Sequence, residues 1–170
     1  MAAGTTYVAL ATTTLTSASS TVSFNSISGS YTDLIIVTNH GNVTDGSGFY
    51  IRFNSDTGSN YSNVAFGSNG SSALAYSVTN DTQIPMNWQY NGFGTSLKNA
   101  VIIHINGYAN TSCYKTILAR MRSVDDGGTS ITQEIVGTWR NTSTVTTIAL
   151  TGNSNFISGS SFTLYGIAAA

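Results

Sequence analysis

The chain has 170 residues, a length that suits one domain with a sizeable hydrophobic core. Only 8% of its residues are charged and its net charge is -1, whereas roughly 25% of the residues in an average soluble domain are charged. The Lys and Arg residues form no basic block, which argues against a nucleic-acid-binding protein, because basic contacts with phosphates supply most of the affinity of such proteins. A surface so poor in charge gives little repulsion between molecules, so the composition favours a component of an assembly.

Two short strands are predicted at the start of the chain, from Thr5 to Leu15 and from Thr21 to Phe24. The stretch from Tyr31 to His40 has a continuous apolar centre, LIIV, which is typical of a strand that is covered on both faces. The stretch GFYIRFN alternates strictly, so we expect its large apolar side chains to share one face. These side chains are Phe49, Ile51 and Phe53.

The region from residue 40 to residue 98 is richer in Gly, Ser and Asn and alternates less clearly. We predict long loops and short strands there, and loops of this kind often carry variable binding functions. A cluster of large side chains follows the only proline, Pro85: Met86, Trp88, Tyr90 and Phe93. Neighbouring turn signals place this cluster near the surface, and Trp and Tyr are favoured in interfaces, so it is our candidate interface. Two alternatives remain for this cluster, a loop that folds back to fill the core and a platform for stacking sugars.

The second half of the chain continues with strand patterns. AVIIHINGY and YKTILARMR are separated by the turn-like stretch ANTSC. In SITQEIVGTWR the spacing of Ile131, Ile135 and Trp139 would also suit a helix, but Thr, Gly and β-branched residues favour a strand. As a strand, it places five residues on one face: Ile131, Gln133, Ile135, Gly137 and Trp139. TVTTIAL and SFTLYGI complete about nine or ten strands.

Turn-forming stretches such as TDGSG, GSNGSS and DDGG separate these strands, and no segment has the pattern of a long amphipathic helix. We therefore predict an all-β fold, an antiparallel β-sandwich or jelly-roll-like single domain over residues 1–170. In the last strand Phe162 and Leu164 face one way, and Tyr165 and Ile167 face the other. We expect that strand to lie inside a sheet with a neighbour on each side.

The sequence contains no recognisable catalytic constellation. His104 shares a strand face with Ile102 and Asn106, which favours a core or interface role over that of a general base. Most of the carboxylates lie in turns, where an Asp side chain accepts hydrogen bonds from the local backbone, so we expect structural roles for all of them. They are Asp33, Asp45, Asp56, Asp81, Asp125, Asp126 and Glu134.

Metal, cofactor and disulfide sites are not expected either. No loop matches the ligand spacing of a calcium-binding loop. Cys113 is the only cysteine, so no internal disulfide can form, and we expect a small buried or neutral thiol. We therefore predict that the protein is not an enzyme and holds no cofactor or metal ion.

No stretch reaches the roughly 18 apolar residues of a membrane-spanning helix. The N-terminus lacks the positively charged region of a signal peptide. We expect synthesis in a cytoplasm without export and no association with a membrane.

Three segments resemble the virion structural proteins of tailed phages of aquatic bacteria, cyanophages included. They are TYVALATTTLTSASSTVSFNSISGSYTDLIIV, GYANTSCYKTILAR and GTWRNTSTVTTIALTGNSNFISGSSFTLYGI, and the Gly-Ser step before FTLYGI is the most specific part. The resemblance covers roughly half of the chain and includes nothing from residue 40 to residue 98. It implies a component of the phage particle with no catalytic residues, in a domain that occurs alone or at the end of tail-fibre chains.

The expected function is that of a non-enzymatic virion structural protein, foremost a capsid decoration or cement protein. Such a protein would bind the major capsid protein or other virion proteins across capsomer junctions, as a homo-oligomer that we expect to be a trimer, and would be found in the virion. The alternative is a tail-fibre or receptor-binding domain that recognises host-surface glycans through the segment from Trp88 to Phe93. A depolymerase is the least favoured alternative, because no pair of carboxylates or catalytic triad stands out.

Overall fold

The computed structural model describes residues 6–86 and 93–168, and all regular secondary structure in these ranges is β-strand. Most strands alternate buried and exposed positions, as β10 does over its ten residues. In chain order the strands are β1 (Tyr7–Thr14), β2 (Ser19–Phe24), β3 (Asp33–His40), β4 (Phe49–Phe53), β5 (Tyr61–Ser68), β6 (Ala73–Asp81), β7 (Ile84–Met86), β8 (Asn99–Asn106), β9 (Lys115–Val124), β10 (Ser130–Trp139), β11 (Ile148–Phe156) and β12 (Ser161–Ile167).

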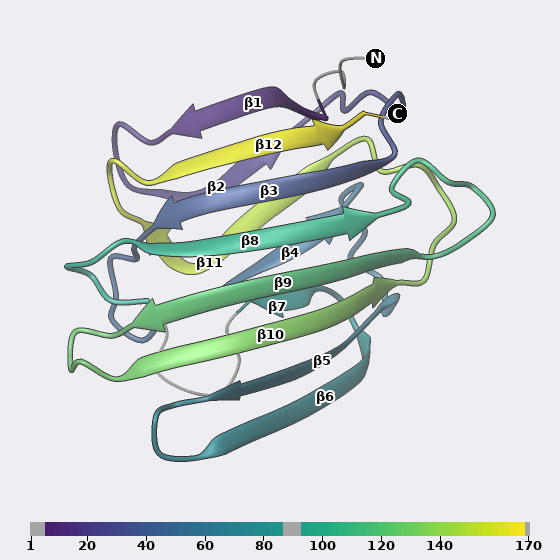
Figure 1. Ribbon diagram of the computed structural model, residues 1–170. Coiled ribbons are helices and arrows are strands. Elements are labelled where there is room, and N and C mark those ends of the chain that lie inside the picture. The colour runs from purple at the N-terminus through teal and green to yellow at the C-terminus, as the bar shows by residue number, and fades with distance from the viewer. Residues whose placement is uncertain (1–5, 87–92, 169–170) are drawn as a thin grey trace.

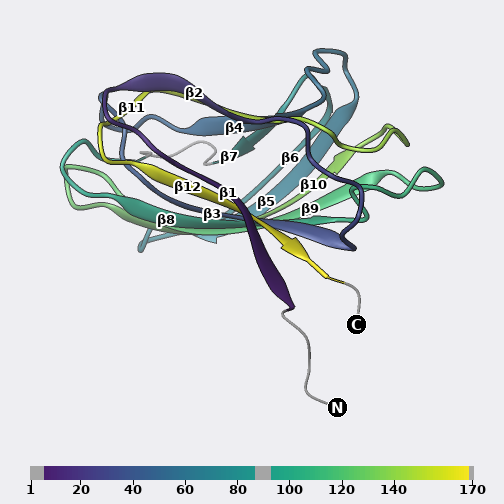
Figure 2. The same cartoon turned by 90° about the horizontal axis from the view of Figure 1, so that it is seen from above.

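These strands form two antiparallel sheets that pack face to face. The large sheet has eight strands in the order β1-β12-β3-β8-β9-β10-β5-β6 (Figure 1). The small sheet has four strands in the order β2-β11-β4-β7 and is stacked on one face of the large sheet (Figure 2). The prediction of an all-β sandwich is confirmed.

Eight of the strands follow the path of a jelly roll. Four antiparallel pairs are nested in the sequence, β1 with β12, β2 with β11, β3 with β8, and β4 with β7. The first half of the chain therefore pairs with the second half in reverse order. Successive strands alternate between the sheets, with β1 and β3 in the large sheet and β2 and β4 in the small one. This wrapping of two Greek keys is the jelly-roll arrangement.

The other four strands are two inserted hairpins. β5 and β6 lie between β4 and β7 in the chain, and β9 and β10 lie between β8 and β11. The hairpins pair with each other through β5 and β10 and join the jelly roll through β8 and β9. They extend only the large sheet, which is why it has twice as many strands as the small sheet.

Large side chains from both sheets fill the space between them. The five residues predicted to share one face of β10 all point inward, and the strand prediction is confirmed there. The Trp139 ring lies 5.6 Å from that of Phe53, and its indole nitrogen donates a 2.7 Å hydrogen bond to Asp56. A Cβ atom on Gly137 would lie 2.7 Å from Ile84, so glycine allows the small sheet to approach β10 closely.

The C-terminal strand β12 lies between β1 and β3, as predicted. Its residues Phe162 and Leu164 are buried between the sheets. Gly166 also faces inward, where a Cβ atom would lie 2.5 Å from the ring of Tyr31. The ring of Tyr31 therefore packs directly on the backbone of β12.

The prediction for residues 40 to 98 was wrong in one respect. The region contains β5 and β6, with eight and nine residues, instead of loops and short strands alone. The inward positions of β5 carry Tyr61, Asn63, Ala65 and Gly67, so small and polar side chains hide the alternation in the sequence. With these strands and the short β7, the described part of the chain has twelve strands, more than the nine or ten predicted.

Candidate functional site

The two faces of the large sheet differ in what covers them. The inner face packs against the small sheet, and its side chains on the central strands are fully buried, as Leu34 and Ile36 of β3 show. The outer face points the other way, and no element within residues 6–86 and 93–168 packs on it (Figure 2). Its residues Ile35 and Val37, from the same strand, remain partly exposed.

Large apolar side chains nevertheless gather on the outer face, where they form what we call the outer apolar strip. The strand register sets them in two adjacent rows that cross β3, β8, β9, β10 and β5. At about 4.8 Å between neighbouring strands, the strip is about 19 Å long. It consists of Ile35, Val37, Val64, Phe66, Ile102, Leu118 and Val136.

The exposure of the strip is high for side chains of this type. Ile102 is 50% exposed and Phe66 is 52% exposed, while Val37 and Val136 are each 37% exposed. These four residues are half of the eight large hydrophobic side chains that are exposed in residues 6–86 and 93–168. Single exposed apolar residues need no explanation, but a contiguous group of them marks an interaction surface.

An open groove of about 590 Å³ runs along one side of the outer apolar strip, from Ile102 of β8 to Phe66 of β5. Arg120 and Glu134 lie between these two side chains in the strand register and form an ion pair at 3.2 Å. The groove is also lined by Arg122, which donates a hydrogen bond to Ser130 at 3.2 Å. The groove thus combines apolar side chains with guanidinium groups, a combination that is common in protein interfaces.

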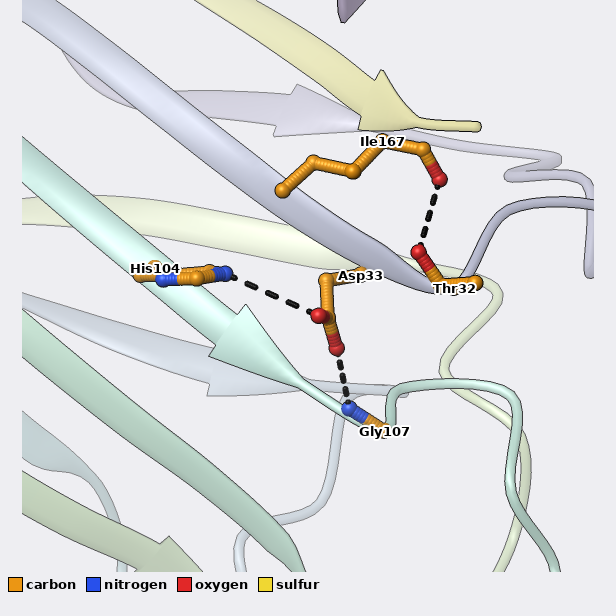
Figure 3. Close-up of polar contacts among 5 residues, drawn as sticks. All are labelled: Thr32, Asp33, His104, Gly107 and Ile167. Atoms are coloured by element: carbon orange, nitrogen blue, oxygen red, sulfur yellow. Dashed lines mark hydrogen bonds and ion pairs between the residues drawn. The ribbon is translucent and has the colours of Figure 1, made fainter. Parts of the chain in front are cut away.

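His104 lies on the outer face beside Asp33 (Figure 3). Nε2 of His104 is 3.8 Å from Oδ2 of Asp33, which is too long for a hydrogen bond. The other oxygen of Asp33 accepts a 2.7 Å hydrogen bond from the backbone nitrogen of Gly107, so it fixes the turn after β8. Across the sheet, His104 is paired with Ile35 and Leu118, neither of which can act as a nucleophile.

The candidate interface from the sequence is not supported where it can be checked. Met86 and Phe93 are fully buried in the core between the sheets, which is the core-filling alternative for this segment. Trp88 and Tyr90 lie outside the described residues. Met86 points inward because β7 pairs with β4. Phe93 points inward because its backbone forms a β-bridge with Ser47, which places its ring beside the buried ring of Phe49.

The second histidine, His40, is enclosed in the core. The rings of Phe49, Phe93, Phe156 and Phe162 lie between 4.3 and 5.8 Å from its ring centre. Its Nδ1 is 2.9 Å from the hydroxyl of Thr38, and its buried Nε2 has no hydrogen-bond partner. Burial lowers the pKa of His40 to about 3, so the imidazole is neutral at neutral pH and out of reach of a substrate.

The aspartates have the structural roles in turns that the sequence predicted. Asp125, Asp126 and Asp81 each accept hydrogen bonds from backbone nitrogens of turns. Burial alone would raise the pKa of Asp56, but hydrogen bonds from Trp139, Asn60 and Gly58 lower it below its ordinary value. No cluster of three or more His, Cys, Asp or Glu residues suited to a metal ion occurs in the part of the chain that the structure describes.

Two polar residues behave differently from what their sequence context suggests. Cys113 is exposed, not buried, because it lies in the turn between β8 and β9. Lys115 is fully buried, and its Nζ donates hydrogen bonds to the carbonyl oxygens of Asn110, Cys113 and Thr142. Burial lowers the pKa of Lys115, and its role is to hold two loops together at one end of the sandwich.

Sequence reasoning missed the outer apolar strip, although a signal for it was present. The runs LIIV, AVII and ILA are apolar at successive positions, so apolar side chains lie on both faces of β3, β8 and β9. We interpreted the first of these runs as a strand covered on both faces. The structure covers only its inner face.

No protein-family model matches the sequence, and neither a curated protein nor a solved structure matches it. Within the described residues, no helix is long and apolar enough to cross a membrane.

Proposed function

We propose that this protein is a non-enzymatic structural component of a tailed-phage particle, foremost a capsid decoration protein. In this proposal the outer apolar strip is the surface that becomes buried when the protein joins the particle. The observation that carries the proposal is the exposure of this strip on strands such as β3 and β8, whose inward side chains are fully buried under the small sheet.

The energetics of the strip support a permanent contact. Burying apolar surface is favourable by about 25 cal/mol per Å², so covering side chains as exposed as Ile102 and Phe66 stabilises an assembly. The charges on the strip are few, and Arg120 and Glu134 already neutralise each other. A partner can therefore cover the strip without leaving many charges unpaired in the interface.

The fold and the sequence resemblance point in the same direction. Jelly rolls recur in viral capsid domains and in lectins, but this is an analogy at the level of the fold and does not identify a function. The segments that resemble phage virion proteins contain β1, β2, β11, β12 and most of β3, which are strands of the jelly roll. They also contain residues 115–120 of β9 and the end of β10, in one of the inserted hairpins. We propose that the protein acts as a homo-oligomer, a trimer, that binds the major capsid protein across capsomer junctions.

Removal of the gene from the phage tests the proposal directly. We expect wild-type particles to contain hundreds of copies, measured by quantitative mass spectrometry, and particles without the protein to release their DNA at a lower temperature. A few to a few dozen copies per particle would instead indicate a tail protein, and binding to host glycans on an array would then support the receptor-binding alternative. Particles that lack the protein but release their DNA at an unchanged temperature would contradict the cement function.

A second experiment tests the strip itself by adding purified variants back to particles that lack the protein. We expect Ile102→Asp and Phe66→Asp to lose binding, because a carboxylate would be buried without a partner. Ser23→Asp is the matched control, since Ser23 is exposed on the far side of the small sheet. Thermal unfolding of each variant shows whether it is folded, and equal binding of all three folded variants would exclude the strip as the contact surface.

A further inference from the structure

The last strand of the large sheet, β6, has an unprotected edge. β6 pairs with β5 on one side, and within residues 6–86 and 93–168 no strand pairs with it on the other. The backbone groups along that side are a template for another strand, and natural proteins usually protect such an edge with charges, proline, bulges or short length. β6 has nine residues, and the stretch from Ala73 to Asn80 contains neither a charged residue nor a proline.

The other edges of the two sheets are shorter or interrupted. β7, at one edge of the small sheet, has three residues and contains Pro85. In β1 the register shifts between Ala9 and Ala11, so that the regular part from Ala11 to Thr14 has four residues. In β6 the register is regular from Ala73 to Val78, over six residues. The edge of β6 is thus the longer uninterrupted edge of the large sheet.

Side chains on both faces of β6 suit the addition of a strand. The inward residues Leu74 and Val78 are only half-buried, because the small sheet has too few strands to reach the end of the large one. The outward residues Ala73, Ala75 and Ser77 are exposed and small, so they would not obstruct a neighbouring strand. A strand beside β6 would extend both the apolar inner surface and the outer face.

We propose that β6 pairs antiparallel with β6 of a second copy of this chain, about a two-fold axis, to form one continuous sheet. When β6 of one copy pairs antiparallel with β6 of another, the two copies use the same edge and are related by a two-fold axis. Both edges are then occupied, so the assembly stops at a pair. Since the stretch from Ala73 to Asn80 is uncharged, no like charges face each other at any register. This inference does not rest on the virion function, and it leaves the outer apolar strip free for another partner.

Cysteine cross-linking tests the contact. Each of the variants Ala73→Cys, Ala75→Cys and Ser77→Cys is made in a Cys113→Ser background. The variant whose new cysteine lies nearest the two-fold axis should form a disulfide-linked dimer within minutes of mild oxidation. A disulfide requires Cα atoms within about 7 Å, so Ala100→Cys, which is exposed but in the middle of the sheet, should not cross-link. If none of the three variants cross-links faster than Ala100→Cys, the proposal is wrong.

The molar mass in solution gives an independent measurement. Light scattering should show an even number of chains in the wild type, and Ala75→Lys should halve the mass without lowering the denaturation midpoint. Because the two-fold contact pairs copies, this halving is expected for a dimer and equally for a hexamer made of two trimers. If the wild type is a monomer or a trimer, and Ala75→Lys has the same molar mass as the wild type, the β6 contact does not form. That result would not change the outcome of the particle experiments above. Higher oligomers that grow with concentration would indicate pairing of β6 with β1 and would also overturn the proposed contact.

Discussion

The inner and outer faces of the large sheet are made by the same strands but have different environments. On β8, Val101, Ile103 and Ile105 point inward and are fully buried, while Ile102, between the first two, points outward and is half exposed. The side chains are chemically alike, so the sequence of β8 does not distinguish the covered face from the uncovered one. Apolar character on both faces of β8 therefore corresponds to one contact within the subunit and, in the function that we propose, to a second contact with a partner.

The two faces should differ most in how they respond to truncation of matched residues. Ile103→Ala removes buried methyl groups and leaves a cavity, and such changes lower the free energy of unfolding by about 2–5 kcal/mol. Ile102→Ala, one residue away on the outer face, should change it by less than about 0.5 kcal/mol. Urea denaturation of both variants at pH 7 measures the difference. Equal losses would mean that the outer face is also covered within the subunit.

The inner face should also resist the addition of a single methyl group. Gly166→Ala places a Cβ atom 2.5 Å from the ring of Tyr31, within van der Waals overlap, so the ring or the strand must move. Overpacking of this kind lowers the free energy of unfolding by about 1–3 kcal/mol, and we expect the upper end of that range.

A double-mutant cycle with Tyr31→Ala assigns this loss to its cause. With the ring removed, Gly166→Ala should cost less than about 0.5 kcal/mol, because the two changes share one contact. A loss of the same size in both backgrounds would attribute the effect to the backbone of Gly166 instead of to the packing of Tyr31.

His40 makes the inner face sensitive to acid. Above pH 6.5, the pKa of His40 in the unfolded chain, the imidazole is neutral in both the folded and the unfolded state. Between pH 6.5 and about pH 3 the imidazole is protonated in the unfolded chain but stays neutral in the folded protein. Stability is therefore lost as the pH falls through this window, by about 1.4 kcal/mol per pH unit once the unfolded histidine is protonated. Between pH 7 and pH 5 we expect a loss of about 2 kcal/mol from this residue.

The variant His40→Leu isolates this contribution, because the other titrating groups, His104 among them, are common to both proteins. The difference between the unfolding free energies of wild type and variant should change by about 2 kcal/mol between pH 7 and pH 5. A difference that is independent of pH would show that the histidine is protonated, or reached by water, within the folded core.

The fold could be predicted because strand alternation is a local property. In β4 every inward position holds a large apolar residue, and in β10 three of the five inward positions do, Ile131, Ile135 and Trp139, so the sequence revealed both strands. In β5 the corresponding positions hold Asn63, Ala65 and Gly67, which bury little apolar surface, so the pattern was lost. The pairing of β5 with β10, which incorporates the hairpin into the large sheet, is a tertiary contact that local periodicity does not encode.

The candidate site could be predicted only in part. The apolar runs in β3 and β8 indicate that both faces are apolar, but they do not say which face is covered by the small sheet and which is left open. The position of Phe93 was harder to predict, since a residue in a loop has no periodicity and its burial depends on contacts with residues distant in the sequence, such as His40. Both failures concern packing between elements and not the elements themselves.

The smallest expected effect concerns the ion pair on the outer face. Arg120 and Glu134 are exposed, and exposed pairs contribute only about 0.2–1 kcal/mol, although their atoms lie 3.2 Å apart. A double-mutant cycle with Arg120→Ala and Glu134→Ala should therefore give a coupling in the unfolding free energy at the lower end of this range, and less in high salt. The same cycle measured on binding to the particle should give a larger coupling, because a partner that covers the strip removes the pair from water. Equal small couplings in both measurements would place the pair outside the contact and would shift the proposed interface toward β3 and the Ile35 end of the strip.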